Sequence, residues 1–63
     1  MKDLVDLNEE IDEQIEDGQL VGAYSHNIIA LVLQQVDREH GRDMANKMID
    51  AWNLEALGWR KLS

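Results

Sequence analysis

The chain has 63 residues, no cysteine, no proline and a formal net charge of -7 at pH 7. A chain this short forms one domain at most, and we expect residues 1–63 to be a single small helical domain. The lack of cysteine excludes disulfides, thiolate zinc sites and cysteine nucleophiles. Because small domains without these supports often oligomerise, the composition favours self-association or a partner.

No part of the sequence predicts membrane insertion or export. The longest apolar run, residues 28–33, is far shorter than the roughly 20 residues that a membrane-spanning helix needs. The start, Met1-Lys2-Asp3, has no apolar stretch behind it and does not have the form of a signal peptide. We therefore expect a cytoplasmic protein that does not bind membranes.

The charge is unevenly distributed along the chain. Residues 1–18 contain eight acids and one lysine, so the whole net charge of -7 lies there. Residues 19–63 contain five acids and five bases and are neutral overall. Such asymmetry is typical of an interaction segment. A solvated helix face that keeps a small protein in solution gives the same pattern.

The first expected element is a helix over residues 4–17. Asp6, with Glu9 three residues later, has the form of a capping box in which Asp replaces Ser or Thr. Gly18 is suited to end the helix. A narrow apolar stripe predicts that this helix packs against a single neighbour; its members are Leu4, Leu7, Ile11 and Ile15.

The second expected element is a helix over residues 24–40. Ser25 is placed to cap it, and Tyr24 precedes Ile29 in the arrangement of a hydrophobic staple. The apolar run 28–33 is also compatible with a buried strand, but the chain has no second run of strand character to pair with it. On a helix the apolar positions cover about 200°, and we take this segment as the central helix, ended by Gly41.

The third expected element is a helix over residues 43–53, with Asp43 as its N-cap and Asn53 in a left-handed conformation at its end. A further turn at residues 54–57 follows, which Gly58 closes, and the basic tail beyond it is expected to fray. The predicted fold class is all-α: three short helices plus a C-terminal turn, in an oligomeric helical bundle. The residues expected at the centre of the buried surface are Leu31, Val32, Val36, Met48 and Trp52.

Side chains that could carry out chemistry are few. His26 and His40 lie at the two ends of the central helix, about 21 Å apart, too far to share a metal ion or a proton relay. The carboxylate pairs of the first helix lack the pattern of a calcium loop. The sequence contains no glycine-rich phosphate loop and no triad pattern. We therefore predict a protein that is not an enzyme, with no cofactor and no metal site.

Direct nucleic-acid binding is disfavoured, because the Lys and Arg residues form only two short pairs. The role of Trp59 is open: it either folds back onto Met44 and Met48 or anchors a partner, a role in which tryptophan is favoured.

Two classes of function are compatible with these patterns. The first is a small acidic protein–protein interaction module, expected to be a homodimer, that binds an unidentified basic protein. The alternative is an inhibitor that mimics nucleic acid and occupies a DNA- or RNA-binding enzyme; in length and charge alone the chain resembles small regulatory proteins of bacteriophages. A mimic should lose its partner steeply with salt, whereas an apolar interface should not. The partner-binding candidates are Glu9, Glu10, Asp12, Glu13, Glu16, Asp17 and Trp59.

Overall fold

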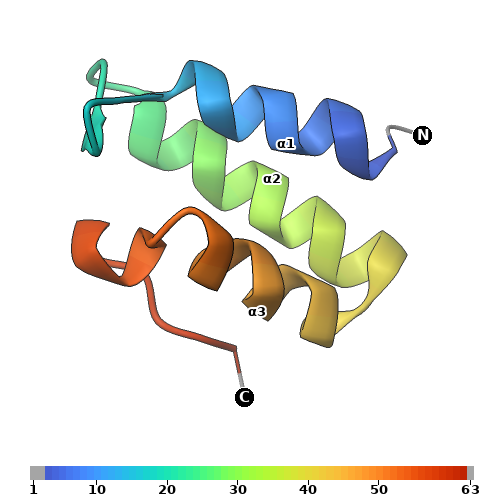
Figure 1. Ribbon diagram of the computed structural model, residues 1–63. Helices are drawn as coiled ribbons and strands as arrows, with labels where there is room; N and C mark the ends of the chain where they lie inside the picture. Colours follow the sequence, from blue (N-terminus) through green and yellow to red (C-terminus); the bar gives the residue numbers. More distant parts are fainter. Residues whose placement is uncertain (1–2, 63) are drawn as a thin grey trace.

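Three α-helices, a short β-hairpin and a 3-10 turn are present in the computed structural model, which describes residues 3–62 (Figure 1). The helices alternate in direction, with α2 lying between α1 and α3 (Figure 1). The expectation of three helices followed by a turn is confirmed. The elements are α1 (Leu4–Glu13), β1 (Ile15–Glu16), β2 (Gln19–Leu20), α2 (Ser25–His40), α3 (Arg42–Ala51) and η1 (Leu54–Leu57).

The hairpin corrects the prediction of an all-α chain and of a helix over residues 4–17. Helix α1 ends at Glu13, and β1 pairs with β2 in an antiparallel register that sets Ile15 opposite Leu20. The two residues between the strands, Asp17 and Gly18, have positive φ angles of 53° and 75°. This is the pattern of a type I′ turn, for which Asp-Gly is a preferred sequence. Gly18 therefore closes a hairpin and does not cap a helix.

Helix α1 starts at Leu4, as predicted, but a different residue caps it. Asp3 is the N-cap, and its Oδ1 accepts a hydrogen bond of 3.0 Å from the backbone N–H of Asp6. The proposed capping box at Asp6 and Glu9 is wrong, because both residues lie inside the helix. Leu4 is the first residue of the helix, and it packs against the core beside the fully buried Leu7.

The core lies between α2 and its two neighbours. Leu7 and Ile11 of α1 are fully buried against residues from α2, α3 and η1. Trp52 is half-buried at the edge, where its indole Nε1–H donates a 3.0 Å hydrogen bond to Oδ1 of Asn8 and so ties the end of α3 to α1. The buried apolar residues are Leu7, Ile11, Ile29, Val32, Leu33, Val36, Ala45, Met48, Ile49 and Leu54.

Burial was correctly predicted for Val32, Val36 and Met48. The prediction is wrong for Leu31, and Trp52 lies half-buried at the edge of the core instead of at its centre. Leu31 is 64% exposed, whereas its neighbour Val32 is 4% exposed. Successive helical residues are about 100° apart, so Leu31 lies about 140° around α2 from Val36, outside the face that α1 and α3 cover. A run of apolar residues cannot all face one core on a helix.

Ser25 joins the end of α1 to the start of α2. Its buried hydroxyl donates to Oε1 of Gln14 at 2.9 Å and accepts from the backbone N–H of Gly22 at 3.0 Å. The backbone carbonyl of Gln14 also accepts from the N–H of Val21 at 3.0 Å. The expected staple is wrong, because Tyr24 is 74% exposed while Ile29 is fully buried. Ser25 therefore holds the connection between two helices and does not cap α2 with its side chain.

A single glycine separates α2 from α3. Gly41 is both the C-cap of α2 and the N-cap of α3, and its φ of 97° is a conformation that favours glycine. Asp43 therefore lies in the first turn of α3, and its predicted role as N-cap is wrong. The left-handed conformation of Asn53 and the closing role of Gly58 are confirmed, with both residues flanking η1.

The neighbouring residues Val32 and Leu31 provide a matched test of this packing. Val32→Asp buries an unpaired carboxylate, and we expect it to lower the free energy of unfolding by more than about 3 kcal/mol. Leu31→Asp places the same group in solvent and should cost less than about 1 kcal/mol. Thermal unfolding followed by circular dichroism measures both; equal losses would contradict the assignment of the core face.

Ser25 gives a second prediction. Ser25→Ala leaves Gln14 Oε1 and the Gly22 N–H without this partner, so the free energy of unfolding should fall by about 1–3 kcal/mol. In a double-mutant cycle with Gln14→Ala, urea denaturation should give a coupling energy of at least about 0.5 kcal/mol. Additive losses would show that the two side chains act independently.

Candidate functional site

The acidic residues of α1 form one exposed surface on the side away from the core. Glu9, Asp12 and Glu13 are all exposed and lie within about 100° of each other around α1. This arc is opposite Leu7 and Ile11, the two residues that are fully buried. The burial of the apolar seam therefore determines that these carboxylates point into solvent.

The hairpin continues the acidic surface beyond the end of α1. Glu16 lies in β1 and Asp17 at the turn, and both are exposed. Glu10 is half-buried and lies at the side of α1 that borders α2, where it lines a groove with Ile28 and Leu31. We define the acidic surface as Glu9, Glu10, Asp12, Glu13, Glu16 and Asp17.

Most of this surface has no counter-ion among the described residues 3–62. Within residues 3–62, no ion pair joins Glu9, Asp12, Glu13, Glu16 or Asp17 to a base. Glu9 and Glu13 are four residues apart on a helix, a spacing at which like charges repel by a few tenths of a kcal/mol. The surface therefore carries unbalanced negative charge, which a basic partner would stabilise.

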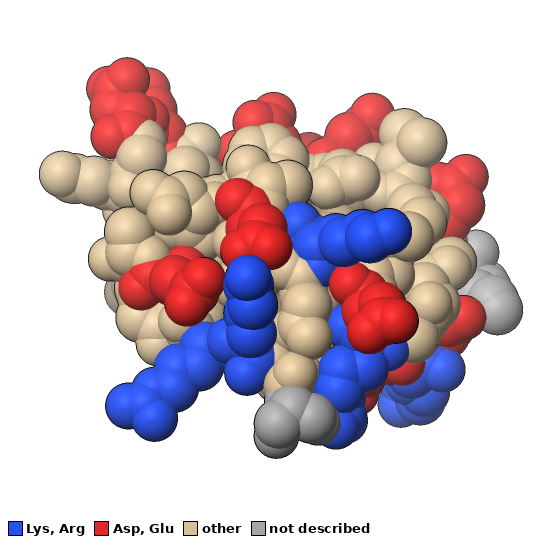
Figure 2. All heavy atoms as spheres, turned by 60° about the horizontal axis from the view of Figure 1, so that its bottom comes forward, with Lys and Arg blue, Asp and Glu red and all other residues tan. Residues whose placement is uncertain are grey.

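Among residues 3–62, Lys and Arg gather on the side of α3 and the C-terminal segment (Figure 2). Figure 2 brings the side of α3 and the C-terminal segment forward and shows Lys and Arg gathered there among several acids, while further acids line the opposite edge. Two of these acids are paired: Asp37 with Arg42 at 3.2 Å and Asp50 with Lys61 at 2.9 Å. The fold therefore separates an acidic side from a side of mixed charge.

An apolar stripe borders the acidic surface on α2. Ile28 and Leu31 follow at helical spacing, with the polar Gln35 one turn after Leu31, and the exposed N-cap residue Tyr24 lies one turn before Ile28. Together with Glu10 and Val32, the three residues of α2 line an open groove of about 220 Å³ between α1 and α2. Sequence reasoning missed this groove because it counted Leu31 with the core.

Trp59 folds back onto the protein, as one of the two predicted alternatives states, but onto a different residue. Its ring stacks on His26 at the start of α2, with 4.3 Å between ring centroids and 18° between planes. It is half-buried and packs against the edge of the core. Its backbone N–H donates to the carbonyl of Leu54. Trp59 therefore attaches the C-terminal segment to α2.

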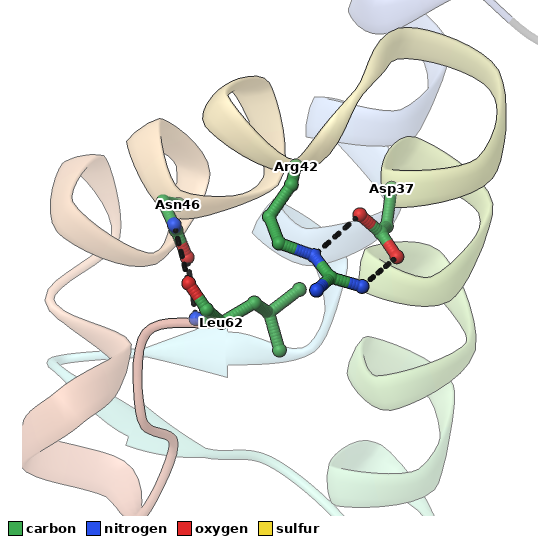
Figure 3. A network of polar contacts seen from close by, with 4 residues as sticks. All are labelled: Asp37, Arg42, Asn46 and Leu62. Carbon is green, nitrogen blue, oxygen red and sulfur yellow. Dashed lines mark hydrogen bonds and ion pairs between the residues drawn. The ribbon is translucent and has the colours of Figure 1, made fainter.

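The segment after Trp59 is held along α3, contrary to the expectation that it frays. Asn46 clamps Leu62 with two hydrogen bonds: its Nδ2 donates to the Leu62 carbonyl at 2.9 Å, and its Oδ1 accepts from the Leu62 N–H at 2.6 Å (Figure 3). The Lys61–Asp50 ion pair lies between the same two elements. A pocket of about 220 Å³ opens beneath this segment, lined by Ala30, Leu33, Gln34, Asp37, Arg42, Ile49, Trp59, Arg60 and Leu62.

Beside this pocket, Arg42 bridges α3 to α2. Its Nε donates a hydrogen bond to Oδ1 of Asp37 and its Nη2 donates one to Oδ2, each at 3.2 Å (Figure 3). This two-bond pairing holds the pKa of Asp37 below its usual value and the pKa of Arg42 above its own. The pair therefore stabilises the short connection through Gly41.

Within residues 3–62, no three His, Asp or Glu side chains are arranged to hold a metal ion. None of the helices described there is long and apolar enough to cross a bilayer. Comparison of the chain with protein-family models, with curated proteins and with solved structures found no match.

The Asp37–Arg42 pair predicts a dependence of stability on pH. Because the pKa of Asp37 is lowered in the folded state, its contribution is fully present above the unfolded pKa of about 3.9 and is lost as the pH falls through the folded pKa. The difference in unfolding free energy between the wild type and Asp37→Asn should therefore be constant above about pH 5 and shrink below about pH 4. Urea denaturation at a series of pH values measures it.

A second variant controls for loss of charge alone. Asp12→Asn removes an exposed acid from the far side of the molecule and keeps the Asp37–Arg42 pair. In this variant, the stability that the pair contributes should therefore fall with decreasing pH as it does in the wild type. A wild-type to Asp37→Asn difference that stays constant down to pH 2 would contradict a stabilising role for the pair.

Proposed function

We propose that this protein is a small interaction module, without catalytic activity of its own, that binds a basic partner protein through its acidic surface. The observation that carries the proposal is the exposure of five of the six acidic candidates on one side of the fold. These five have no base paired with them among residues 3–62. Complementary charge speeds association and selects the partner.

The two pockets described above give no support to an enzyme. Their titratable lining residues are Glu10 in one and the paired Asp37 and Arg42, with Arg60, in the other. Neither lining set joins a nucleophile to a general base, the arrangement that covalent and acid–base catalysis require. Both volumes of about 220 Å³ lie below the roughly 300–1,000 Å³ of typical small-molecule sites.

Formation of a homodimer is a second part of the proposal, and it is independent of binding to a basic partner. The homodimer was expected because the apolar arc of α2 is wide. Within one chain, however, α1 and α3 already cover most of that arc. The exposed Leu31 stripe is the part that remains for a second copy. A charge of -7 on each copy opposes association. Light scattering of the intact chain measures the state directly.

The alternative, mimicry of nucleic acid, uses the same acidic surface. The observation in its favour is the close spacing of Glu9, Asp12 and Glu13, at three and four residues on one helix. A mimic would occupy the nucleic-acid site of its partner, so excess DNA or RNA would displace it. An interaction module that binds elsewhere on its partner would remain bound.

The proposal predicts that a cross-linked partner is basic and that its affinity depends on the acidic side chains of α1. With a photo-crosslinking amino acid at position 12, cells of the source organism should yield a basic protein as the main adduct. Glu9→Gln/Glu13→Gln removes two exposed charges and should weaken binding of the purified partner about fivefold, at roughly 0.5 kcal/mol per charge. Isothermal calorimetry measures this affinity.

The control variant removes the same number of charges from elsewhere. Asp43 and Glu55 are exposed acids on α3 and η1, so Asp43→Asn/Glu55→Gln should leave the affinity unchanged. An equal loss in both double variants would show that only net charge matters. An adduct with an acidic protein would contradict the proposal.

A further inference from the structure

The groove beside the acidic surface lies between α1 and an exposed stripe of α2. The stripe from Tyr24 to Gln35 runs along α2 for about 16 Å, which equals the length of about 11 helical residues. Tyr24 and Leu31 are among the most exposed large apolar side chains described in the protein. The groove at the middle of the stripe is open, and its apolar lining consists of Ile28, Leu31 and Val32.

The charge around this groove selects the partner. Glu10 lines the groove on the α1 side, and the exposed acids of α1 and the hairpin lie on the elements beyond it. An apolar stripe with Glu10 at its edge and further carboxylates on the neighbouring elements matches a helix with one apolar face and flanking lysines or arginines. The apolar contact would supply affinity, and the charges would supply orientation and speed of association.

We propose that the groove between α1 and α2 receives the apolar face of a basic amphipathic helix of the partner protein. This inference rests on the function proposed above, since the same partner contacts the acidic surface. Leu31 is the central contact, with Ile28 and Tyr24 on one side and Gln35 on the other.

A second copy of this chain is a poorer occupant for an electrostatic reason. Glu10 borders the groove, so a symmetric pairing across Leu31 would bring the acidic helices of two copies, each with a net charge of -7, close to one another. Like charges across an interface oppose binding, whereas a basic helix removes the repulsion that already exists on α1.

The experiment is an NMR titration of the intact, nitrogen-15-labelled protein. The probe is a synthetic peptide of about 14 residues, built of leucine and lysine with the leucines at helical spacing. We expect the largest amide shifts at Ile28, Leu31 and Gln35, and about tenfold weaker binding to Leu31→Gln. A peptide of the same composition in scrambled order should bind Leu31→Gln and the wild type equally.

Val5→Gln is the matched control. Val5 is 65% exposed, like Leu31, but lies on α1 about 160° around the helix from the buried Leu7 and does not line the groove. It should change the affinity less than twofold. Circular dichroism confirms that both variants remain folded.

The outcomes separate this inference from the function it rests on. Shifts confined to α1 and the hairpin, with binding weakened by Glu9→Gln/Glu13→Gln but not by Leu31→Gln, would overturn the groove and leave the acidic surface standing. Binding that neither set of substitutions weakens would overturn both. A dimer in light scattering that Leu31→Gln converts to a monomer would assign the groove to a second copy and overturn the inference.

Discussion

The packing of α1 against α2 through Leu7 and Ile11 is the contact on which the rest of the structure depends. Both side chains are fully buried. Burial of a large aliphatic side chain contributes about 1.5–3 kcal/mol. This contact holds in place a helix whose carboxylates repel each other at spacings of three and four residues. It also determines the function we propose, because burying one side of α1 exposes the acids on the other.

The connection between α1 and α2 determines where the acidic surface ends and the apolar groove begins. The type I′ turn at Asp17 and Gly18 reverses the chain within two residues, and the Ser25 hydroxyl ties Gln14 to the loop before α2. Helix α1 runs antiparallel to α2 (Figure 1). That arrangement places Glu10 beside Leu31, so a charged and an apolar contact lie in one site.

The C-terminal segment completes the opposite side of the fold. Trp59 stacks on His26, and Asn46 holds the backbone of Leu62, so the segment covers part of α2 and α3. Its Lys61 pairs with Asp50 of α3 at 2.9 Å, on the side of mixed charge. The result is a protein with two chemically different sides, of which only the α1 side carries a large excess of one charge.

The sequence by itself determined the three helices, the positions of Val32, Val36 and Met48 in the core, and the concentration of negative charge in residues 1–18. These properties follow from periodicity and composition, which are local. The Asp-Gly turn was also readable from the sequence, but Gly18 fitted the end of a helix equally well. Only the pairing of Ile15 with Leu20 in the folded protein shows that Gly18 belongs to a hairpin turn and not to the end of a helix.

Only the tertiary structure decided which side of each helix is covered. Six consecutive apolar residues on α2 leave the direction of the core undetermined, and the placement of α1 and α3 is what exposes Leu31 and buries Ile29. The partner of Trp59 was likewise decided by the path of the chain after η1, which brings it to His26, a residue 33 positions earlier in the sequence. Contacts between distant residues depend on how the elements are oriented, and local spacing carries no information about that orientation.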